Sequence, residues 1–132
     1  MTGTLNVGDT FTLEVPTITR TTLALYAGAS GDHNPAHIDI DAVRAVGYPD
    51  VFGHGMLSMA YLGRLLTDWV PQDRIRSYSV RFAAITPVNV APTCHGTVLD
   101  VEDGLAHLDL TMTLPDGTVT LRGSATVATE QD

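Results

Sequence analysis

The chain has 132 residues and a formal net charge of −8, with seven basic residues against 15 acidic ones. This charge argues against nucleic-acid binding, which depends on neutralising phosphates with Lys and Arg. Apolar residues make up 44% and charged residues 17% of the chain, which is typical of a folded protein, and the length suits one domain over residues 1–132. No apolar run approaches the ~20 residues needed to span a bilayer, so we expect no membrane association.

The cysteine content and the N-terminus favour a cytoplasmic location. Cys94 is the single cysteine of the chain, which excludes an internal disulfide and suits a reducing compartment. The first residues, Met1 to Asn6, lack a basic region followed by an apolar one, so we expect no signal peptide.

The first 31 residues predict a strand followed by a helix. Thr10–Val15 alternates polar and apolar side chains, as a half-buried strand does. Thr19 is a candidate N-cap for a helix from Arg20 to about Ala29. Two glycines, Gly28 and Gly31, are expected to end that helix.

Two further helices are predicted before the β-rich half of the chain. Asp39 is a candidate cap for a short helix that stops at Gly47. A long apolar helix should run from His54 to Val70, where Pro71 stops it. Several apolar or small residues recur on it near helical spacing: Met56, Met59, Ala60, Gly63, Leu66 and Val70. Leu57, Leu62 and Leu65 extend the apolar surface, so we expect other structure to wrap this helix.

The remainder predicts β-structure. Arg74 to Ile85 and Thr93 to Val101 are expected to be strands. Two more runs carry apolar residues at every second position, from Ala106 to Leu114 and from Val119 to Val127. Asp103-Gly104 and Pro115-Asp116-Gly117 are tight-turn signals that join neighbouring runs into an antiparallel meander. A long buried helix with such a meander predicts an α+β fold in which an antiparallel sheet wraps the helix.

The stretch Gly31-Asp32-His33-Asn34-Pro35-Ala36-His37 carries the strongest chemical signal. A carboxylate, a carboxamide and an imidazole follow one another within a few residues, and acid/base chemistry needs such a pair held near one small reacting fragment. Proline fixes its own φ and disfavours a helical residue before it, so Asp32 and His37 are expected on irregular backbone rather than on a helix face. A well-made turn without catalytic function is the alternative interpretation of these residues alone.

This stretch, followed by Gly47 and by His54-Gly55-Met56, resembles the hydratase motif of the MaoC-like, or (R)-specific enoyl-thioester hydratase, family. The resemblance runs from about Val7 to about Val127. It implies a single hot-dog domain with a catalytic loop segment that overhangs the sheet. It also implies a homodimer, or a heterodimer with a second hot-dog subunit. The implied reaction is reversible addition of water to a trans-2-enoyl thioester of coenzyme A or acyl-carrier protein, which gives an (R)-3-hydroxyacyl thioester.

The resemblance also assigns roles. Asp32 and His37 match the family's catalytic residues; His37 deprotonates a water that Asp32 helps to hold, and the pair relays a proton to C2. Asn34 orients the loop or the water, or is simply a turn residue. The matching family glycine, here Gly55, donates its N–H to the thioester carbonyl, whereas His54 is expected to line or support the pocket.

One position departs from the pattern of some family members, and no cofactor or metal is expected. Those members carry a second hydroxyl donor two turns further along the helix, where this chain has Gly63 and where Ser58 does not match. Six potential metal ligands are close in sequence: Asp32, His33, His37, Asp39, Asp41 and His54. Pro35 argues against a helix that aims both His33 and His37 at one ion, and Asp39-x-Asp41 lacks the remaining ligands of a calcium loop.

Two other functions remain open. The chain can be a hot-dog thioesterase, or a non-catalytic acyl-thioester-binding or partner subunit of a heteromeric hydratase; the intact Asp32, Asn34, His37 and Gly55 count against the second. The densest basic group, Arg74, Arg76 and Arg81, is either a patch for an anionic carrier or a set of solvated charges.

Overall fold

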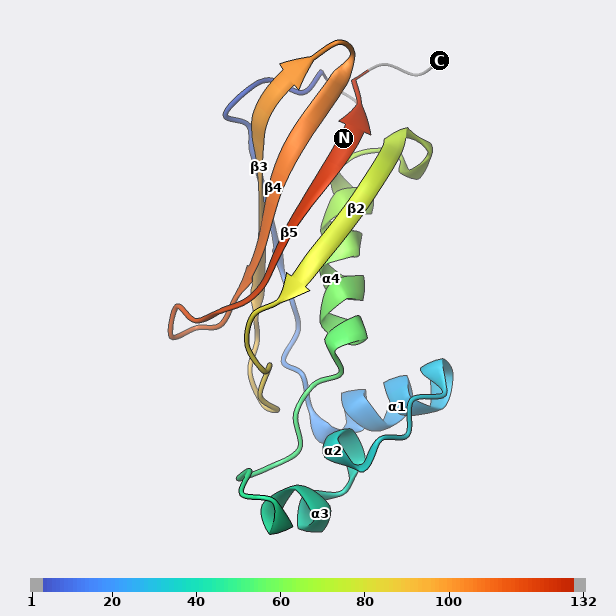
Figure 1. The fold of residues 1–132 in the computed structure, drawn as a ribbon, viewed down its shortest axis with the longest axis vertical. Coiled ribbons are helices and arrows are strands. Elements are labelled where there is room, and N and C mark those ends of the chain that lie inside the picture. The colour runs from blue at the N-terminus through green and yellow to red at the C-terminus, as the bar shows by residue number, and fades with distance from the viewer. Residues whose placement is uncertain (1–3, 130–132) are drawn as a thin grey trace.

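The computed structural model describes residues 4–129, in which one antiparallel sheet packs against one long helix (Figure 1). The sheet has five strands in the order β1-β3-β4-β5-β2. These strands are β1 (Thr10–Glu14), β2 (Ile75–Phe82), β3 (Thr93–Glu102), β4 (Leu105–Thr113) and β5 (Val119–Ala128). This architecture is the hot-dog fold, and it confirms the α+β class predicted from the sequence.

The meander was predicted correctly because its signals are local. β3, β4 and β5 are consecutive antiparallel neighbours. Their tight turns fall at Asp103-Gly104 and around Gly117, both of which the sequence indicated. Along β4 the side chains at every second position, from Ala106 to Met112, are buried, and those between them face outward or are only partly covered. The sequence did not indicate that β2 pairs with β5 at the far edge of the sheet.

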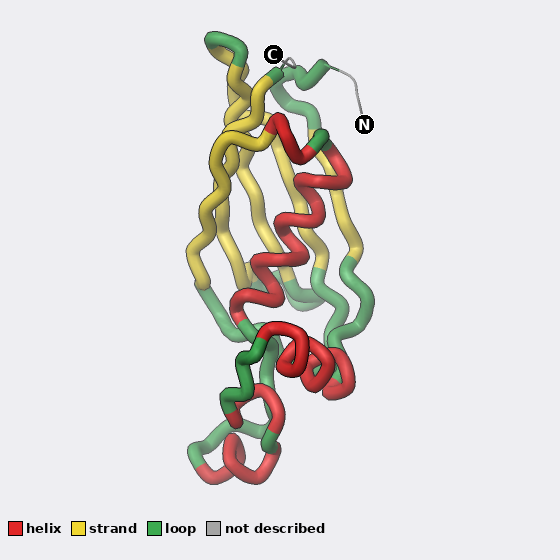
Figure 2. Tube along the Cα trace, turned by 90° about the vertical axis from the view of Figure 1, so that its right-hand side faces the viewer, coloured by secondary structure: helices red, strands yellow, loops and turns green. Residues whose placement is uncertain are grey.

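The core lies between the sheet and α4 (Gly55–Trp69), which crosses the concave face of the sheet (Figure 2). Trp69 is 1% exposed and stacks on Phe11 of β1, with 5.6 Å between ring centroids. The indole can sit this close to β3 because Gly96 has no side chain: a Cβ there would be 2.7 Å from Cζ3 of Trp69. Close packing of this kind makes the helix position sensitive to a single methyl group.

The buried face of α4 differs from the one expected. Its buried side chains are Leu57, Ser58, Leu62, Leu65, Leu66 and Trp69. Met56 is 58% exposed and Ala60 is also exposed, so the apolar face that included them was wrong. The sheet covers one side of the helix, and within residues 4–129 nothing covers the other. None of the helices in that range is long and apolar enough to cross a membrane.

Three shorter helices form a separate layer at the N-terminal end of α4 (Figure 1). They are α1 (Arg20–Ser30), α2 (Pro35–Ile38) and α3 (Ile40–Ala45). Thr19 caps α1 in a reciprocal capping box, and Gly31 ends it with φ +79°, a left-handed conformation that glycine adopts without strain. Asp39 caps α3 by accepting hydrogen bonds from the amides of Asp41 and Ala42. These caps were predicted, and they fix where the intervening loops begin.

Arg74 is not part of an exposed basic patch. Arg74 lies in the 3₁₀ helix η1 (Gln72–Arg74) and is only 7% exposed. Its guanidinium donates to the carbonyl oxygens of Ala128 at 2.7 Å and Thr129 at 2.6 Å, so it ties the end of β5 to the start of β2. Arg81, by contrast, is exposed on the strand itself. The strand expected from Arg74 to Ile85 is shorter at both ends: it begins at Ile75, because Arg74 belongs to η1, and it ends at Phe82.

Candidate active site

A cavity of about 320 Å³ opens at the N-terminal end of α4, where the small helices meet the sheet. It is lined by residues of α2, α4, β2, β5 and the loops next to α4 and β2: His37, Phe52, Gly53, Gly55, Ser58, Phe82, Ala83, Ala84, Ile85, Thr86 and Leu121. Most of this lining is apolar. His37, Gly55, Ser58 and Thr86 bring the functional groups, so polar chemistry is concentrated at a few points of an apolar wall, as in most small-molecule sites.

The ring of His37 is oriented by a main-chain carbonyl. His37 lies on α2, and its Nδ1 is 2.7 Å from the carbonyl oxygen of Phe52. A carbonyl can only accept, so Nδ1 carries the proton. In the neutral imidazole the other nitrogen, Nε2, then has a free lone pair. This hydrogen bond therefore leaves Nε2 able to accept a proton from a bound molecule.

Asp32 lies beside this imidazole, in the loop between α1 and α2. Its side chain is exposed, and one carboxylate oxygen accepts a hydrogen bond from the amide of Asn34 at 3.2 Å. A carboxylate oxygen of Asp32 and one ring nitrogen each of His37 and His54 lie within 4.8 Å of one another. Within residues 4–129 no direct hydrogen bond joins the Asp32 and His37 side chains. Groups this close can both bond one water, because each hydrogen bond spans about 2.7–3.2 Å.

His54 contacts both His37 and Asp32. It is 1% exposed and does not line the cavity. Its ring stacks on that of His37, with 3.9 Å between centroids and 27° between planes, and the Tyr26 ring meets it edge-on at 4.7 Å. Its Nε2–H donates to the main-chain carbonyl of Asp32 at 3.2 Å. Burial, more than any nearby charge, lowers the pKa of His54 below its ordinary value. The imidazole that stacks on His37 is therefore uncharged at neutral pH.

The first turn of α4 offers unpaired amides to the cavity. His54 occupies the N-cap but makes no side-chain capping bond. Its carbonyl accepts from the amides of Leu57 and Ser58, whereas the amides of Gly55 and Met56 have no acceptor among residues 4–129. The Phe82 ring covers Gly55 so closely that a Cβ there would lie 3.0 Å from Cε1. The helix dipole adds partial positive charge at this point, so the site favours an oxygen that carries negative charge.

The placement of His37 corrects one expectation. It was predicted on irregular backbone, yet Pro35 begins the one-turn helix α2 and His37 lies on it. Proline disfavours a helical residue before it but is well suited to the first position of a helix. His33 precedes that helix, so the two histidines do not share a helix face. Asn34 caps α2, because its Oδ1 accepts from the amide of Ala36 at 3.0 Å, which is the turn role left open above.

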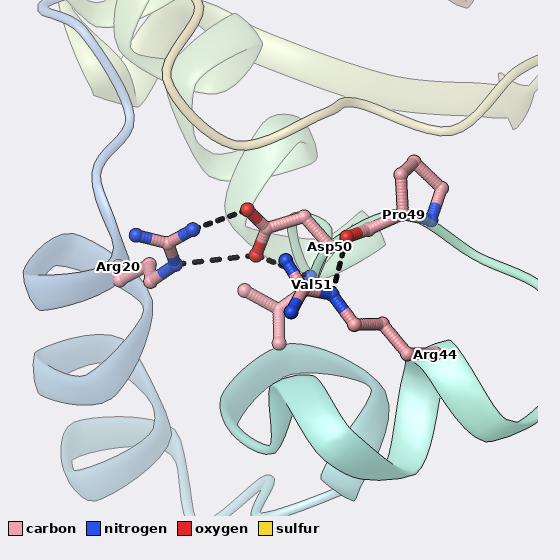
Figure 3. A network of polar contacts seen from close by, with 5 residues as sticks. All are labelled: Arg20, Arg44, Pro49, Asp50 and Val51. Atoms are coloured by element: carbon pink, nitrogen blue, oxygen red, sulfur yellow. Dashed lines mark hydrogen bonds and ion pairs between the residues drawn. The ribbon is translucent and has the colours of Figure 1, made fainter.

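A polar clamp holds the segment that supplies the Phe52 carbonyl (Figure 3). The Arg20 guanidinium on α1 forms a bidentate ion pair with Asp50, and Asp50 also accepts from the amide of Val51 at 2.8 Å. Arg44 of α3 donates to the carbonyl of Pro49 at 3.0 Å. The hydrogen bonds from Arg20 hold the pKa of Asp50 below its usual range. The clamp joins two small helices to the loop between α3 and α4, which contains Phe52.

Comparison with known proteins identifies the family. The MaoC like domain matches residues 5–113. The chain belongs to this family. It is 38% identical over 111 residues to 3-hydroxyacyl-thioester dehydratase X of Mycobacterium tuberculosis, covering 80% of this chain and 37% of that protein. It is 32% identical over 117 residues to an (R)-specific enoyl-CoA hydratase of Rhodospirillum rubrum, covering 84% and 79%.

A solved structure supports the fold of this MaoC-like chain. A chain of the ChsH1–ChsH2 complex from Mycobacterium tuberculosis superposes with a TM-score of 0.83 at 23% sequence identity. The superposition covers 95% of this chain and 98% of that one. The chain therefore spans the whole of one hot-dog relative, but only 37% of the length of dehydratase X.

The Asp32, His37 and His54 cluster of this MaoC-like chain has the ligand types of a metal site, but its geometry does not suit one. Imidazole binds an ion along a lone pair in the plane of its ring. Rings stacked 3.9 Å apart at 27° hold their lone pairs in two nearly parallel planes, so one ion can hardly lie in both planes.

The sequence did not indicate two residues that line the cavity of this MaoC-like chain, Ser58 and Thr86. Ser58 was noted only as failing to match a family position, and Thr86 was not considered. The structure places both hydroxyls in the cavity wall, 3.3 Å apart. Ser58 carries a usable signal, since it lies one helical turn after Gly55. Thr86 carries none, because its loop reaches the cavity only through the tertiary fold.

Proposed function

We propose that this MaoC-like chain is a hydro-lyase that reversibly adds water to trans-2-enoyl thioesters, giving (R)-3-hydroxyacyl thioesters. One observation carries the proposal: His37, with its free Nε2, and Gly55, with its unpaired amide, line the same cavity, and a carboxylate oxygen of Asp32 lies within 4.8 Å of a ring nitrogen of His37. Hydration needs both parts, because a base must activate water while a donor stabilises charge on the thioester oxygen. The 38% and 32% identities to a dehydratase and a hydratase support the same reaction.

The proton transfers follow from the tautomer of His37. With its Nδ1 proton bonded to Phe52, the ring takes a proton from water at Nε2 while the water oxygen bonds to C3 of the substrate. Electrons of the double bond move to the thioester oxygen, and a proton delivered to C2 completes the addition. Asp32 holds the water from its other side and takes part in the delivery. Because the two groups act on one water, they are best described as a coupled pair.

Gly55 stabilises the intermediate charge. The enolate oxygen accepts the amide hydrogen of Gly55 at the start of α4, where the helix dipole also favours an anion. A single preorganised donor of this kind lowers a barrier by about 2.7–4 kcal/mol. A side chain at Gly55 would overlap the Phe82 ring, which lines the same cavity.

His54 acts by position. Its ring fixes the plane of His37 by stacking, and its Nε2–H fixes the main chain of Asp32. Since the ring is neutral and buried, it supports the pair without adding charge beside it. Asn34 sets the direction of α2 through its cap.

A second hot-dog subunit completes the proposed enzyme. β2 is the last strand of the sheet and has one unpaired edge, which is a ready template for another strand. Near the cavity, Met56, Phe82 and Ile85 are 58%, 52% and 44% exposed, so apolar surface beside the site also lacks a cover. Whether the partner is a second copy or a different chain is measured by native mass spectrometry of the purified protein, alone and after co-expression with neighbouring hot-dog chains.

The substrate's carrier is coenzyme A or an acyl-carrier protein. Arg74 is buried and cannot contact either one, which leaves exposed arginines such as Arg81 for contacts to phosphate. A cytoplasmic location stays a prediction; the free, buried thiol of Cys94 is compatible with it.

The experiment is incubation of the purified protein with crotonyl-CoA and with longer enoyl-CoA thioesters. We expect loss of enoyl absorbance and an (R)-3-hydroxyacyl-CoA product that retains its thioester. Release of free CoA would instead indicate a thioesterase. Tight binding without turnover, in the presence of any co-purifying partner, would indicate a binding subunit and contradict the proposal.

A further inference from the structure

The Ser58 and Thr86 hydroxyls form a buried polar pair that the mechanism above does not use. Ser58 is 2% and Thr86 is 4% exposed, and both line the cavity. Their oxygens are 3.3 Å apart, and neither side chain has another hydrogen-bond partner among residues 4–129. Serine inside a helix often bonds the carbonyl four residues earlier. Here that carbonyl, of His54, already accepts two amides, and the Ser58 hydroxyl faces Thr86 instead.

The pair has one donor hydrogen to spare. Each hydroxyl carries one hydrogen and can accept at two lone pairs. A single bond between the two oxygens uses one hydrogen and leaves the other without an acceptor. The surrounding cavity wall is largely apolar, with Phe52, Phe82 and Ile85 among its side chains. A buried O–H in such a wall gains most from a bound acceptor, because leaving it unpaired costs free energy.

The Ser58 hydroxyl lies on the side of the helix that also presents the amide of Gly55. Ser58 follows Gly55 by three residues on α4, so the two positions share one face of the helix. The Cα–Cβ bond of a helical residue tilts toward the helix N-terminus. The Ser58 hydroxyl therefore leans toward the first turn, where the Gly55 amide is unpaired. Two donors on one helix face then converge on the same part of the cavity.

We propose that Ser58 is a catalytic residue that donates a second hydrogen bond to the thioester oxygen, and that Thr86 positions it. In this arrangement the Thr86 O–H donates to Ser58 Oγ, and the Ser58 O–H donates to the substrate oxygen beside the Gly55 N–H. The inference rests on the proposed hydratase function, because the oxygen in question is the one that becomes the enolate.

The kinetic test compares Ser58→Ala, Ser58→Thr and Thr86→Val. We expect Ser58→Ala to lower kcat about 10²-fold, the effect of removing one oxyanion donor, and to raise KM by no more than about 3–10-fold, the effect of losing one hydrogen bond to the ground-state thioester. Ser58→Thr keeps the hydroxyl and should restore most of the rate. Thr86→Val keeps the volume and should lower kcat less, and its effect should nearly vanish on top of Ser58→Ala because the two groups act as one unit.

The matched control is Ser124→Ala on β5. Ser124 also pairs with another hydroxyl at 3.3 Å, that of Ser79, but both are exposed and neither lines the cavity. Its kinetics should equal those of the wild type. An unchanged kcat in Ser58→Ala, with an active wild type, would overturn the role of Ser58 and leave the hydratase function standing.

A binding measurement tests the contact without turnover. Butyryl-CoA carries the thioester oxygen, whereas S-butyl-CoA, a thioether, lacks it. Ser58→Ala should weaken butyryl-CoA binding about 3–10-fold, the effect of losing one hydrogen bond, and leave S-butyl-CoA binding unchanged. Equal weakening of both ligands would show that Ser58 only shapes the pocket and would overturn the inference. This result is obtained even if the wild type hydrates no enoyl-CoA, which would contradict the proposed function separately.

Discussion

Replacing Gly55 by alanine should damage the site while leaving the fold intact. The new Cβ would lie 3.0 Å from Cε1 and 3.2 Å from Cδ1 of Phe82. Carbon atoms normally rest about 3.5–4.0 Å apart, so the overlap is roughly 0.3–1 Å. Either the Phe82 ring or the first turn of α4 must move by that amount.

The two possible movements have different costs. Phe82 is 52% exposed, so its ring can shift without disturbing the core, and we expect the free energy of unfolding to fall by less than about 1 kcal/mol. Both Gly55 and Phe82 line the cavity, so either movement changes the position of the thioester against the Gly55 amide. A misplacement approaching 1 Å costs up to about 10²-fold in rate. We therefore expect kcat/KM to fall 10- to 100-fold with a nearly unchanged melting temperature.

The assay is enoyl-CoA hydration at several substrate concentrations, together with thermal unfolding of each variant. Gly28→Ala is the matched control, because Gly28 lies inside helix α1 and its Cβ would meet nothing within 4 Å. This control should keep full activity and gain about 0.5–1 kcal/mol of stability from helix propensity. Wild-type kinetics in Gly55→Ala would refute the proposed contact between the Gly55 amide and the thioester, because the added methyl group would then not affect substrate binding or reaction.

Further predictions concern the core and the buried titratable groups. Gly96→Ala should destabilise the protein by about 1–3 kcal/mol in urea unfolding, because its Cβ would lie 2.7 Å from the Trp69 indole; an unchanged midpoint would contradict the tight helix–sheet contact. His54 has a pKa below its ordinary value of 6.5 when folded. The unfolded state therefore binds more protons just below that pH, and stability should decline as pH falls from about 6.5 toward the lower pKa of the folded state. His54→Gln should flatten this dependence, whereas His95→Gln, at an exposed position, should not. Cys94 is buried and its thiol pKa is raised to about 12, so a thiol reagent should label it only after unfolding, and rapid labelling of the native protein would contradict its burial.

Local signals predicted the parts of the fold that depend on neighbours in sequence. Thr19 and Asp39 cap their helices because a side-chain oxygen bonds an amide two or three residues later. Alternation along β4 gave the correct inward face, because every second side chain of a strand points the same way. The pairing of β2 with β5 could not be obtained in this way, since it depends on where the whole sheet ends.

The sequence also did not predict that Met56 is exposed and Arg74 is buried, because both outcomes depend on distant parts of the fold. An apolar side chain near helical spacing predicts a buried face only if something covers it. On α4 the sheet covers the side with Leu62 and Trp69, which leaves Met56 outside. Arg74 is buried because two main-chain carbonyls at the end of β5 accept from its guanidinium. The sequence around Arg74 does not indicate that the carbonyls of Ala128 and Thr129 will lie beside it.

The sequence also predicted only some features of the candidate site. Asp32 and His37 were predicted from side-chain type and spacing, and Gly55 from the family resemblance; the structure places His37 and Gly55 at one cavity and Asp32 close to His37. The Phe52 carbonyl that sets the tautomer of His37 was not found, because any residue offers a main-chain carbonyl. The stacking of His54 on His37 also arises only when α2 and the start of α4 meet.

The most direct test of the central claim is hydration of an enoyl-CoA by Asp32→Asn and His37→Ala, with butyryl-CoA binding measured on the same preparations. If the two side chains transfer protons to and from one water, each variant should lose about 10²–10⁴-fold in kcat. Binding of butyryl-CoA should stay close to that of the wild type, because neither side chain is proposed to hold the thioester. A variant that binds normally and retains nearly full activity would contradict the assignment of this pair.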